Sequence, residues 1–311
     1  MSKAIDFTQT TTTNAGWQDV DVTALVTAGA TGVWGFFDKS GGTTTRWIGW
    51  RYNGDPSAAL LQILNTNGRK TFFAVGLDAN KKFEVYIDND DVDLYIGGEF
   101  GQDFTAFTTL KSPTYALTGW IDIDCSAHVP AGAVAVIYGC VSTADDGFGV
   151  RAKGSAHTLV GYITRINGGI MTLDANRKFQ ISRSANTTIY ILGYLTDGTF
   201  KVDPYLMDTV TTGWQDFDLT PDGPPADDRI GVFWGLGTAT YNSSMRQKGS
   251  AFNILRTSRQ DMFAIALDVN DVVQYNVGTA TLDLYLWGYL APNKVFVPPP
   301  FVSFYPSPDG T

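Results

Sequence analysis

The stretch GWQDVDV at residues 16–22 decides the fold, because the chain repeats it twice more. It returns as GWIDIDC at residues 119–125 and as GWQDFDL at residues 213–219, with the tryptophan and both aspartates kept each time. Recurrence of a phrase roughly every hundred residues is typical of tandem structural units. The chain is therefore expected to hold three copies of one module.

Three further landmarks follow each copy in the same order. An apolar segment comes first, GVWGFF, AVAVIYG or IGVFWG, and then a basic tip ending in glycine, RYNG, RAKGS or RQKGS. The phrase LDAN or LDVN begins at Leu77, Leu173 and Leu267, and a last strand reads DLYIGG, TIYILGY or DLYLWGY. The glycine of the opening phrase precedes the LDxN aspartate by 62, 55 and 55 residues. Such constant order and spacing indicate one duplicated unit.

Composition indicates strands rather than helices. Of 31 acidic residues only Glu84 and Glu99 are glutamate, and aspartate favours caps and turns over helix interiors. The chain also holds 33 glycines, 8 tryptophans, 14 tyrosines and 19 phenylalanines, which suits strands joined by turns. Alternating segments such as KKFEVYI predict strands with one buried face.

The predicted fold class is therefore all-β, with three tandem antiparallel β-sandwich domains, jelly-roll-like, and extended N- and C-terminal arms. Each sandwich is expected to have its own core. The predicted division is an N-terminal arm at 1–15, repeats at 16–99, 119–195 and 213–290, linkers at 100–118 and 196–212, and a proline-rich arm at 291–311.

Charge and motifs exclude several function classes. A net charge of −9 disfavours nucleic acid as a partner, because phosphate binding needs a basic face. No run approaches the roughly 20 apolar residues that cross a bilayer, and the opening MSKAIDFTQTTTT has no apolar signal core. The glycine-rich loops that bind dinucleotides or nucleotide phosphates are missing, so no cofactor is expected. A soluble protein made in a reducing cytoplasm is predicted.

The repeated aspartates allow three interpretations. Asp19 and Asp21 lie two residues apart on one strand, so their side chains share a face. They could bind a cation, act as an acid/base pair, or simply point outward from a half-buried edge strand, and the structural interpretation is favoured. The LDxN phrase is expected to form a hairpin turn, because aspartate and asparagine cap tight turns.

No other side chains form a convincing site. The cluster Asp88, Asp90, Asp91 and Asp93 is the best calcium candidate, but it lacks the glycine and terminal glutamate of an EF-hand loop, and a solvated loop is the favoured interpretation. His128 and His157 show no metal-ligand spacing, and no GxSxG elbow supports a Ser-His-Asp arrangement. Cys125 and Cys140 are expected to be free buried thiols, with a bridge possible if their strands adjoin. No catalytic residue is assigned.

Aromatic residues suggest binding surfaces in two places. Trp34, Trp47, Trp50 and Tyr52 crowd one region of the first repeat, and Trp234 and Trp287 appear in the third. These rings could stack on sugars or pack in the core, which is the favoured interpretation. The C-terminal arm has six prolines in its last 21 residues, which makes it extended and apolar. It is either a disordered terminus or an arm that docks on another subunit; the candidate partner-binding residues are Phe296, Val297, Phe301, Phe304 and Tyr305.

The GWxDxD phrase, the RxKGS tip, the LDAN turn and the final YxxGY strand resemble the short β-sandwich repeats of virion structural proteins in tailed bacteriophages. The resemblance covers nearly the whole chain apart from the arms, and the first repeat departs from it with RYNGD and an inserted loop. It implies a non-enzymatic protein of the virion, made in the host cytoplasm: a capsid decoration or cement protein, a head fibre or a tail component.

The partners that this resemblance implies are other virion proteins and further copies of the chain. A carbohydrate-binding adhesion module, which would recognise a glycan on the host surface, is the alternative. A glycan hydrolase is disfavoured because no carboxylate constellation supports one.

Overall fold

The computed structural model describes residues 5–7, 16–39, 46–57, 61–64, 70–89, 91–113, 119–158, 161–183, 186–207, 213–222, 230–250, 254–277 and 282–290. Within these ranges the chain is built of antiparallel strands, and the only helix is the three-residue 3-10 turn η1 (Thr220–Asp222). The all-β prediction is confirmed.

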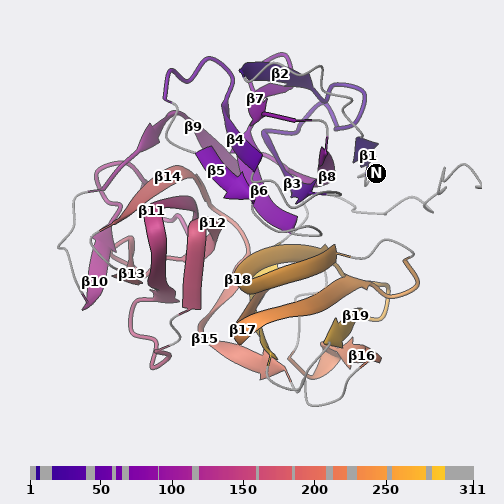
Figure 1. The fold of residues 1–311 in the computed structure, drawn as a ribbon. Coiled ribbons are helices and arrows are strands. Elements are labelled where there is room, and N and C mark those ends of the chain that lie inside the picture. The colour runs from indigo at the N-terminus through magenta and orange to yellow at the C-terminus, as the bar shows by residue number, and fades with distance from the viewer. Residues whose placement is uncertain are drawn as a thin grey trace, which may run out of the picture.

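The first unit consists of eight strands in two sheets (Figure 1). They are β1 (Ile5–Phe7), β2 (Trp17–Asp21), β3 (Gly32–Lys39), β4 (Arg46–Tyr52), β5 (Leu61–Leu64), β6 (Lys70–Gly76), β7 (Lys82–Ile87) and β8 (Val92–Phe100). One sheet has the order β1-β8-β3-β6 and the other β2-β7-β4-β5. Eight antiparallel strands that alternate between two four-stranded sheets in this way form a jelly roll.

The second and third units repeat this plan with fewer, longer strands. Unit 2 contains β9 (Phe104–Lys111), β10 (Gly119–Asp124), β11 (Ala135–Ala152), β12 (Gly161–Thr172), β13 (Lys178–Arg183) and β14 (Thr187–Leu195). Unit 3 contains β15 (Thr199–Met207), β16 (Gly213–Asp218), β17 (Ile230–Gln247), β18 (Ile254–Ala266), β19 (Val272–Val277) and β20 (Leu282–Leu290).

Long strands connect the two layers in these units. The start of β11 pairs with β14 and its end pairs with β13, so one strand supplies the positions of β3 and β4. β17 does the same between β20 and β19, and β12 and β18 follow β11 and β17 along their length. All three units therefore have jelly-roll topology.

A β-bulge occurs at the same place in every unit. The register shifts between Trp34 and Gly35 against β8, between Ile137 and Tyr138 against β14, and between Val232 and Phe233 against β20. In each case the extra residue on the partner strand directly precedes the paired glycine Gly98, Gly193 or Gly288. A bulge bends the strand and increases its twist. Its recurrence supports the duplication inferred from the sequence.

The segments predicted to be linkers contain strands, which corrects that prediction. Residues 104–111 form β9, which pairs with β14, and residues 199–207 form β15, which pairs with β20. In the N-terminal arm, β1 pairs with β8 in the same way. Each unit therefore begins one strand before its GW phrase. Residues 1–4, 8–15 and the C-terminal arm lie outside the described residues.

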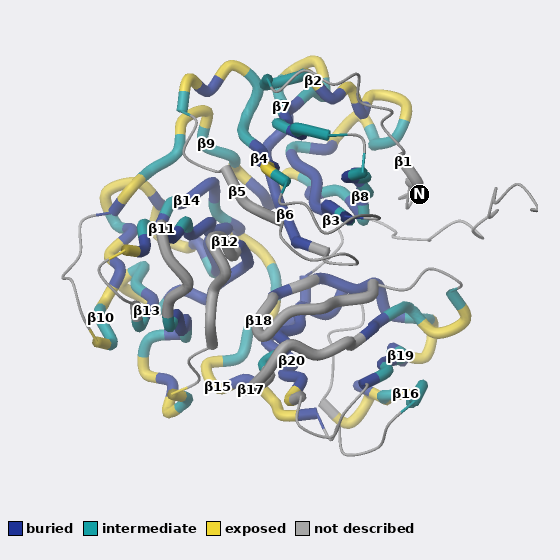
Figure 2. Tube along the Cα trace, viewed as in Figure 1, coloured by how far each residue is buried: buried dark blue, intermediate teal, exposed yellow. Residues whose placement is uncertain are grey.

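The three units lie around a common centre, where β6, β12 and β18 contact one another (Figure 1). Figure 2 shows buried segments within each unit and exposed ones at the outer turns. The buried apolar side chains of all three units belong to one contiguous cluster, from Val20 in unit 1 to Leu290 in unit 3. The units therefore bury apolar surface against each other as well as inside each sandwich.

Candidate functional site

The three repeated tryptophans are each covered by an arginine. The guanidinium carbon of Arg51 lies 4.0 Å from the ring centre of Trp17, that of Arg151 lies 4.0 Å from Trp120, and that of Arg246 lies 3.8 Å from Trp214. Each arginine is the first residue of the basic tip, and each tryptophan opens the GW phrase. A planar guanidinium stacked on an indole is a favourable cation–π pair.

The same arginines also bind a third strand. Arg51 Nε donates to Glu84 at 2.8 Å, and the equivalent bonds from Arg151 to Gln180 and from Arg246 to Gln274 are also 2.8 Å. Two of these arginines also donate from Nη1 to a described backbone carbonyl. Arg51 donates to Ser57 at 2.9 Å, and Arg151 donates to His157 at 2.7 Å. The repeated arginine thus joins the GW strand, its own strand and the strand after LDxN. Its role is structural, and this role was not predicted from the sequence.

The aspartates of the GW phrase point outward and are used locally. The first of each pair forms an ion pair: Asp19 with Lys82 at 3.6 Å, Asp216 with Lys248 at 2.6 Å, and Asp122 with Lys153. The second of each pair accepts a bond from a backbone N–H two residues on, at 2.8–2.9 Å: Thr23, Ser126 and Thr220.

Both aspartates have lowered pKa values where a shift is resolved. The bond from Lys153, followed by that from Gln180, lowers the pKa of Asp122, and bonds from Ser126 lower that of Asp124. Carboxylates held ionised in this way are poor proton donors. The structural interpretation of the repeated aspartates agrees with these contacts.

The LDxN phrase forms a tight turn but not a hairpin. In unit 1, Asp78 Oδ1 accepts from the backbone N–H of Asn80 and Lys82, both at 2.8 Å, and units 2 and 3 repeat the two bonds. The residue after the asparagine has a positive φ in each copy, 59° at Lys81, 62° at Arg177 and 59° at Asp271. The strands on either side, β6 and β7, belong to different sheets, so the turn connects the two layers.

The calcium candidates that are described contact the protein itself. Asp91 Oδ1 accepts from Arg46 Nε at 2.6 Å, and Asp88 Oδ2 accepts from the backbone N–H of Trp47 at 2.9 Å. Asp93 lies half-buried on β8, and Asp90 lies outside the described residues. Among described residues no cluster of three or more His, Cys, Asp or Glu side chains could hold a metal.

Most of the tryptophans proposed for sugar stacking belong to the core. Trp34, Trp50, Trp234 and Trp287 are between 0 % and 3 % exposed, whereas Trp47 is 43 % exposed. Trp234 and Trp287 meet edge to face with ring centres 5.4 Å apart. Core packing, the favoured interpretation, is correct for these four side chains.

Cys125 and Cys140 are free and buried, as predicted. Burial raises the pKa of the Cys125 thiol to about 12, so the thiolate is scarce at neutral pH.

Ser155, His157 and Asp203 come together, yet they do not form a nucleophile relay. Ser155 Oγ donates to Asp203 at 2.7 Å, and the backbone N–H of His157 donates to Ser155 Oγ at 3.1 Å. The imidazole ring meets the ring of Tyr285 edge to face at 5.5 Å. The hydroxyl therefore bonds directly to the carboxylate, whereas a relay would require the imidazole between them.

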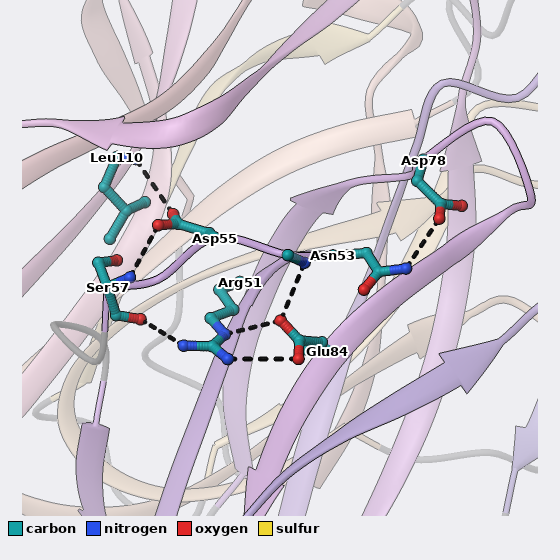
Figure 3. Close-up of polar contacts among 8 residues, drawn as sticks. Arg51, Asn53, Asp55, Ser57, Asp78, Glu84 and Leu110 are labelled. Carbon is teal, nitrogen blue, oxygen red and sulfur yellow. Dashed lines mark hydrogen bonds and ion pairs between the residues drawn. The ribbon is translucent and has the colours of Figure 1, made fainter.

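This serine marks the seam between units 2 and 3, and an equivalent position marks the seam between units 1 and 2. Asp55 follows the first basic tip as Ser155 follows the second. It is 1 % exposed, and its Oδ2 accepts from the backbone N–H of Leu110 on β9, at 3.2 Å (Figure 3). The first strand of each following unit thus packs on the basic tip of the unit before it.

The hydrogen bonds at the two seams run in opposite directions. In the first, the tip residue Asp55 is the acceptor, whereas in the second, Ser155 donates to Asp203 on β15. The pairing of β9 with β14 is equivalent to that of β15 with β20, and it aligns Thr109 with Asp203 and Leu110 with Pro204. Proline has no N–H, so the second seam does not need the acceptor that Leu110 requires.

Three different residues occupy equivalent positions in the central strands. Phe72, Gly168 and Met262 each lie five residues before the leucine of LDxN. A Cβ added to the next residue, Gly169, would lie 2.4 Å from Met262 Sδ, and one added to Gly168 would lie 3.6 Å from the ring of Trp50. Gly169 of unit 2 therefore leaves room for Met262 of unit 3, whereas a Cβ at Gly168 would make an ordinary contact with Trp50 of unit 1.

Phe296, Val297, Phe301, Phe304 and Tyr305, the predicted partner-binding residues, lie outside the described residues. Within the described residues no helix has the length and hydropathy to cross a membrane.

Comparison with known proteins finds similar architecture at low similarity. No family model and no curated protein matches the sequence. A chain from a study of the triple jelly-roll fold and turret assembly in an archaeal virus is 7 % identical, with 89 % of this chain and 82 % of that chain covered and a TM-score of 0.24. A chain of Sulfolobus Turreted Icosahedral Virus is 8 % identical, with 90 % and 84 % covered and a TM-score of 0.24.

A third similar structure comes from a different class of protein. The tandem CBM22-1–CBM22-2 domains of Paenibacillus barcinonensis Xyn10C are 9 % identical, with 88 % of this chain and 81 % of that chain covered and a TM-score of 0.18. At such TM-scores these similarities carry no argument about function.

Proposed function

We propose that this chain is a non-enzymatic structural protein on the outside of a tailed-phage particle, where it acts as a capsid decoration or cement protein. One observation carries the proposal: three jelly-roll units are fused and packed around one centre within a single chain. Such an object presents nearly the same surface three times, which suits a local threefold position of a shell.

The use of the repeated polar side chains supports this proposal. A catalytic repeat would hold its reactive groups free for a substrate, whereas these arginines and aspartates bond within the unit. The tip positions Asp55 and Ser155 bond to the next unit instead. What the three copies share is therefore the set of contacts that shape each unit.

The C-terminal arm is proposed to attach the protein to a neighbouring virion subunit. Its residues Phe296, Val297, Phe301, Phe304 and Tyr305 supply apolar side chains, and its prolines favour an extended backbone. A stable attachment buries about 1,600 Å² in total, and aromatic side chains are frequent anchors of such interfaces.

Location in the particle is the decisive test. Gradient-purified particles should contain this protein by mass spectrometry, and difference density between particles with and without it should lie on the outer surface of the capsid. Absence from purified particles would contradict the proposal. Density on the tail would retain a structural role but reject the decoration role.

The arm can be tested by truncation. Protein lacking residues 291–311 is expected to keep its circular dichroism spectrum and to lose most of its binding to particles made without the native protein. The matched control is Val269→Ser, which changes a side chain 84 % exposed on the LDVN turn of unit 3. Equal binding by the truncated and full chains would reject the arm as the attachment.

The carbohydrate-binding alternative has less support. A sugar-stacking surface needs several exposed rings, and of the tryptophans proposed for it Trp34 and Trp50 are buried. Specific binding on a glycan array, lost in Trp47→Ala, would favour this alternative over the structural role.

A further inference from the structure

Exposed apolar side chains gather on one strand of unit 3. Among described residues, five large apolar side chains are exposed, and three of them lie on β15: Val202 at 49 %, Tyr205 at 47 % and Leu206 at 50 %. We call these three residues the β15 strip. Tyr205 also meets Phe217 of β16, with ring centres 6.3 Å apart, which extends the apolar surface.

Unit 2 does not share the strip with unit 3. The pairing of β9 with β14 and of β15 with β20 aligns Val202 with Thr108, Tyr205 with Lys111, and Leu206 with Ser112. Unit 2 thus presents hydroxyls and a lysine where unit 3 presents apolar side chains. Exposed apolar groups on an edge strand favour pairing with another segment, and proteins usually avoid them.

The end of the described chain lies beside this strand. β20 ends at Leu290, and its residue Tyr289 pairs with Thr199 at the start of β15. From that point 21 residues follow, among them the apolar stretch VFVPPPFV at residues 295–302. Of units 2 and 3, only unit 3 is followed by such a segment, and only unit 3 carries the strip.

We propose that the β15 strip is the docking surface for the C-terminal arm of the same chain. Residues 291–294, Ala-Pro-Asn-Lys, reverse the direction of the chain, because proline and asparagine favour turns. Residues 295–302 then run along the outer edge of β15. Thr199 pairs with Tyr289 and Leu206 pairs with Tyr285, so this part of β15 covers four strand steps of β20, about 13 Å. Seven extended steps from Val295 to Val302 span about 22 Å, which is long enough to cover it.

The chemistry of the arm fits an edge strand. Pro298, Pro299 and Pro300 cannot donate backbone hydrogen bonds, so the segment attaches mainly through apolar contact and does not extend the sheet further. Attachment within one chain is favoured because the short connection gives a high effective concentration. The docked segment ends near Val302, so Phe296, Val297 and Phe301 contact β15 of their own chain. Of the proposed attachment residues, Phe304 and Tyr305 then remain for the neighbouring subunit. This inference does not depend on the proposed function.

Limited trypsin digestion of the full chain tests the docking. Lys294 is a cleavage site within the proposed reversal, and cleavage there reports the undocked population. Val202→Asp and Leu206→Asp, both at exposed positions, are expected to speed this cleavage on the order of tenfold, because each places a charge against apolar side chains. Thr108→Asp, at the matched position of β9, is expected to leave the rate unchanged. Equal rates in all four proteins would overturn the proposal.

Cross-linking identifies the occupant. The double variant Leu206→Cys/Val302→Cys, treated with a short bismaleimide, is expected to give a cross-link within one chain, found by mass spectrometry in the monomer band. Thr108→Cys/Val302→Cys is the control pair and is expected to give none. Cross-linked dimers would show that the arm of a second copy occupies the strip, and either dimers or an absence of cross-links would overturn docking within the chain.

Discussion

Reversing the direction of the hydrogen bond between units 1 and 2 tests whether Asp55 joins these units as described. Asp55→Ser is expected to lower the free energy of unfolding by about 1–3 kcal/mol, because the backbone N–H of Leu110 loses its buried acceptor. The bond from Ser57 N–H to residue 55, 2.9 Å long, should survive, since Ser155 accepts the equivalent bond from His157 at 3.1 Å. The loss therefore reports the seam alone.

The second half of the cycle adds a carboxylate on the other side. Thr109→Asp alone is expected to destabilise, because the new carboxylate lies beside Asp55. In the double variant a serine faces an aspartate, as Ser155 faces Asp203, so the two losses should not add.

Urea denaturation followed by tryptophan fluorescence on the four proteins gives the coupling energy. It is expected to be favourable and to exceed about 0.5 kcal/mol, the usual limit of additivity. Additive losses with an unchanged m-value would refute the assigned seam geometry.

Three further outcomes are expected. Arg151→Lys should lower the free energy of unfolding by about 1–2 kcal/mol, because lysine keeps the charge but loses the stack on Trp120 at 4.0 Å and the two-pronged hydrogen bonding of the guanidinium. A loss under about 0.5 kcal/mol in denaturant melts would argue against the stack. The free energy of unfolding should fall as the pH drops below about 4, because the pKa of Asp124 is lower in the folded protein than in the unfolded chain. The stabilisation is present above the unfolded pKa and is lost on acidification. Asp124→Asn should reduce the dependence of the free energy of unfolding on pH, and an unchanged dependence would contradict this. Cys125 and Cys140 should react with a thiol reagent at pH 8 only after unfolding, and fast labelling of the native protein would show that they are accessible.

The sequence predicted the architecture because its signals were local. The LDxN aspartate bonds within four residues and the second aspartate of each GW phrase bonds two residues on, so the spacing and order of these phrases were sufficient to identify three β-sandwich units. The turn residues Asp78, Asp174 and Asp268 accept the backbone bonds that their residue type predicts.

What the sequence did not predict depends on contacts between distant segments. β9 reads FTAFTTLK, without clear alternation, because it is an edge strand with one side on unit 1 and a bulge in its pairing. The Arg–Trp pairs are separated by 34, 31 and 32 residues, and this constant spacing was the signal that could have identified them. The hairpin expected at LDxN was wrong because a local turn does not determine which sheet the next strand joins.

The centre of the molecule has a consequence for how such a chain can evolve. In a trimer of identical subunits any substitution on the axis appears three times, so a phenylalanine there would meet two more. Here the equivalent positions hold an aromatic ring at Phe72, no side chain at Gly168 and a flexible thioether at Met262. Fusion into one gene thus freed the axis from symmetry, and it also made the order of the copies heritable: a chain with its units shuffled would bring together side chains selected for different neighbours.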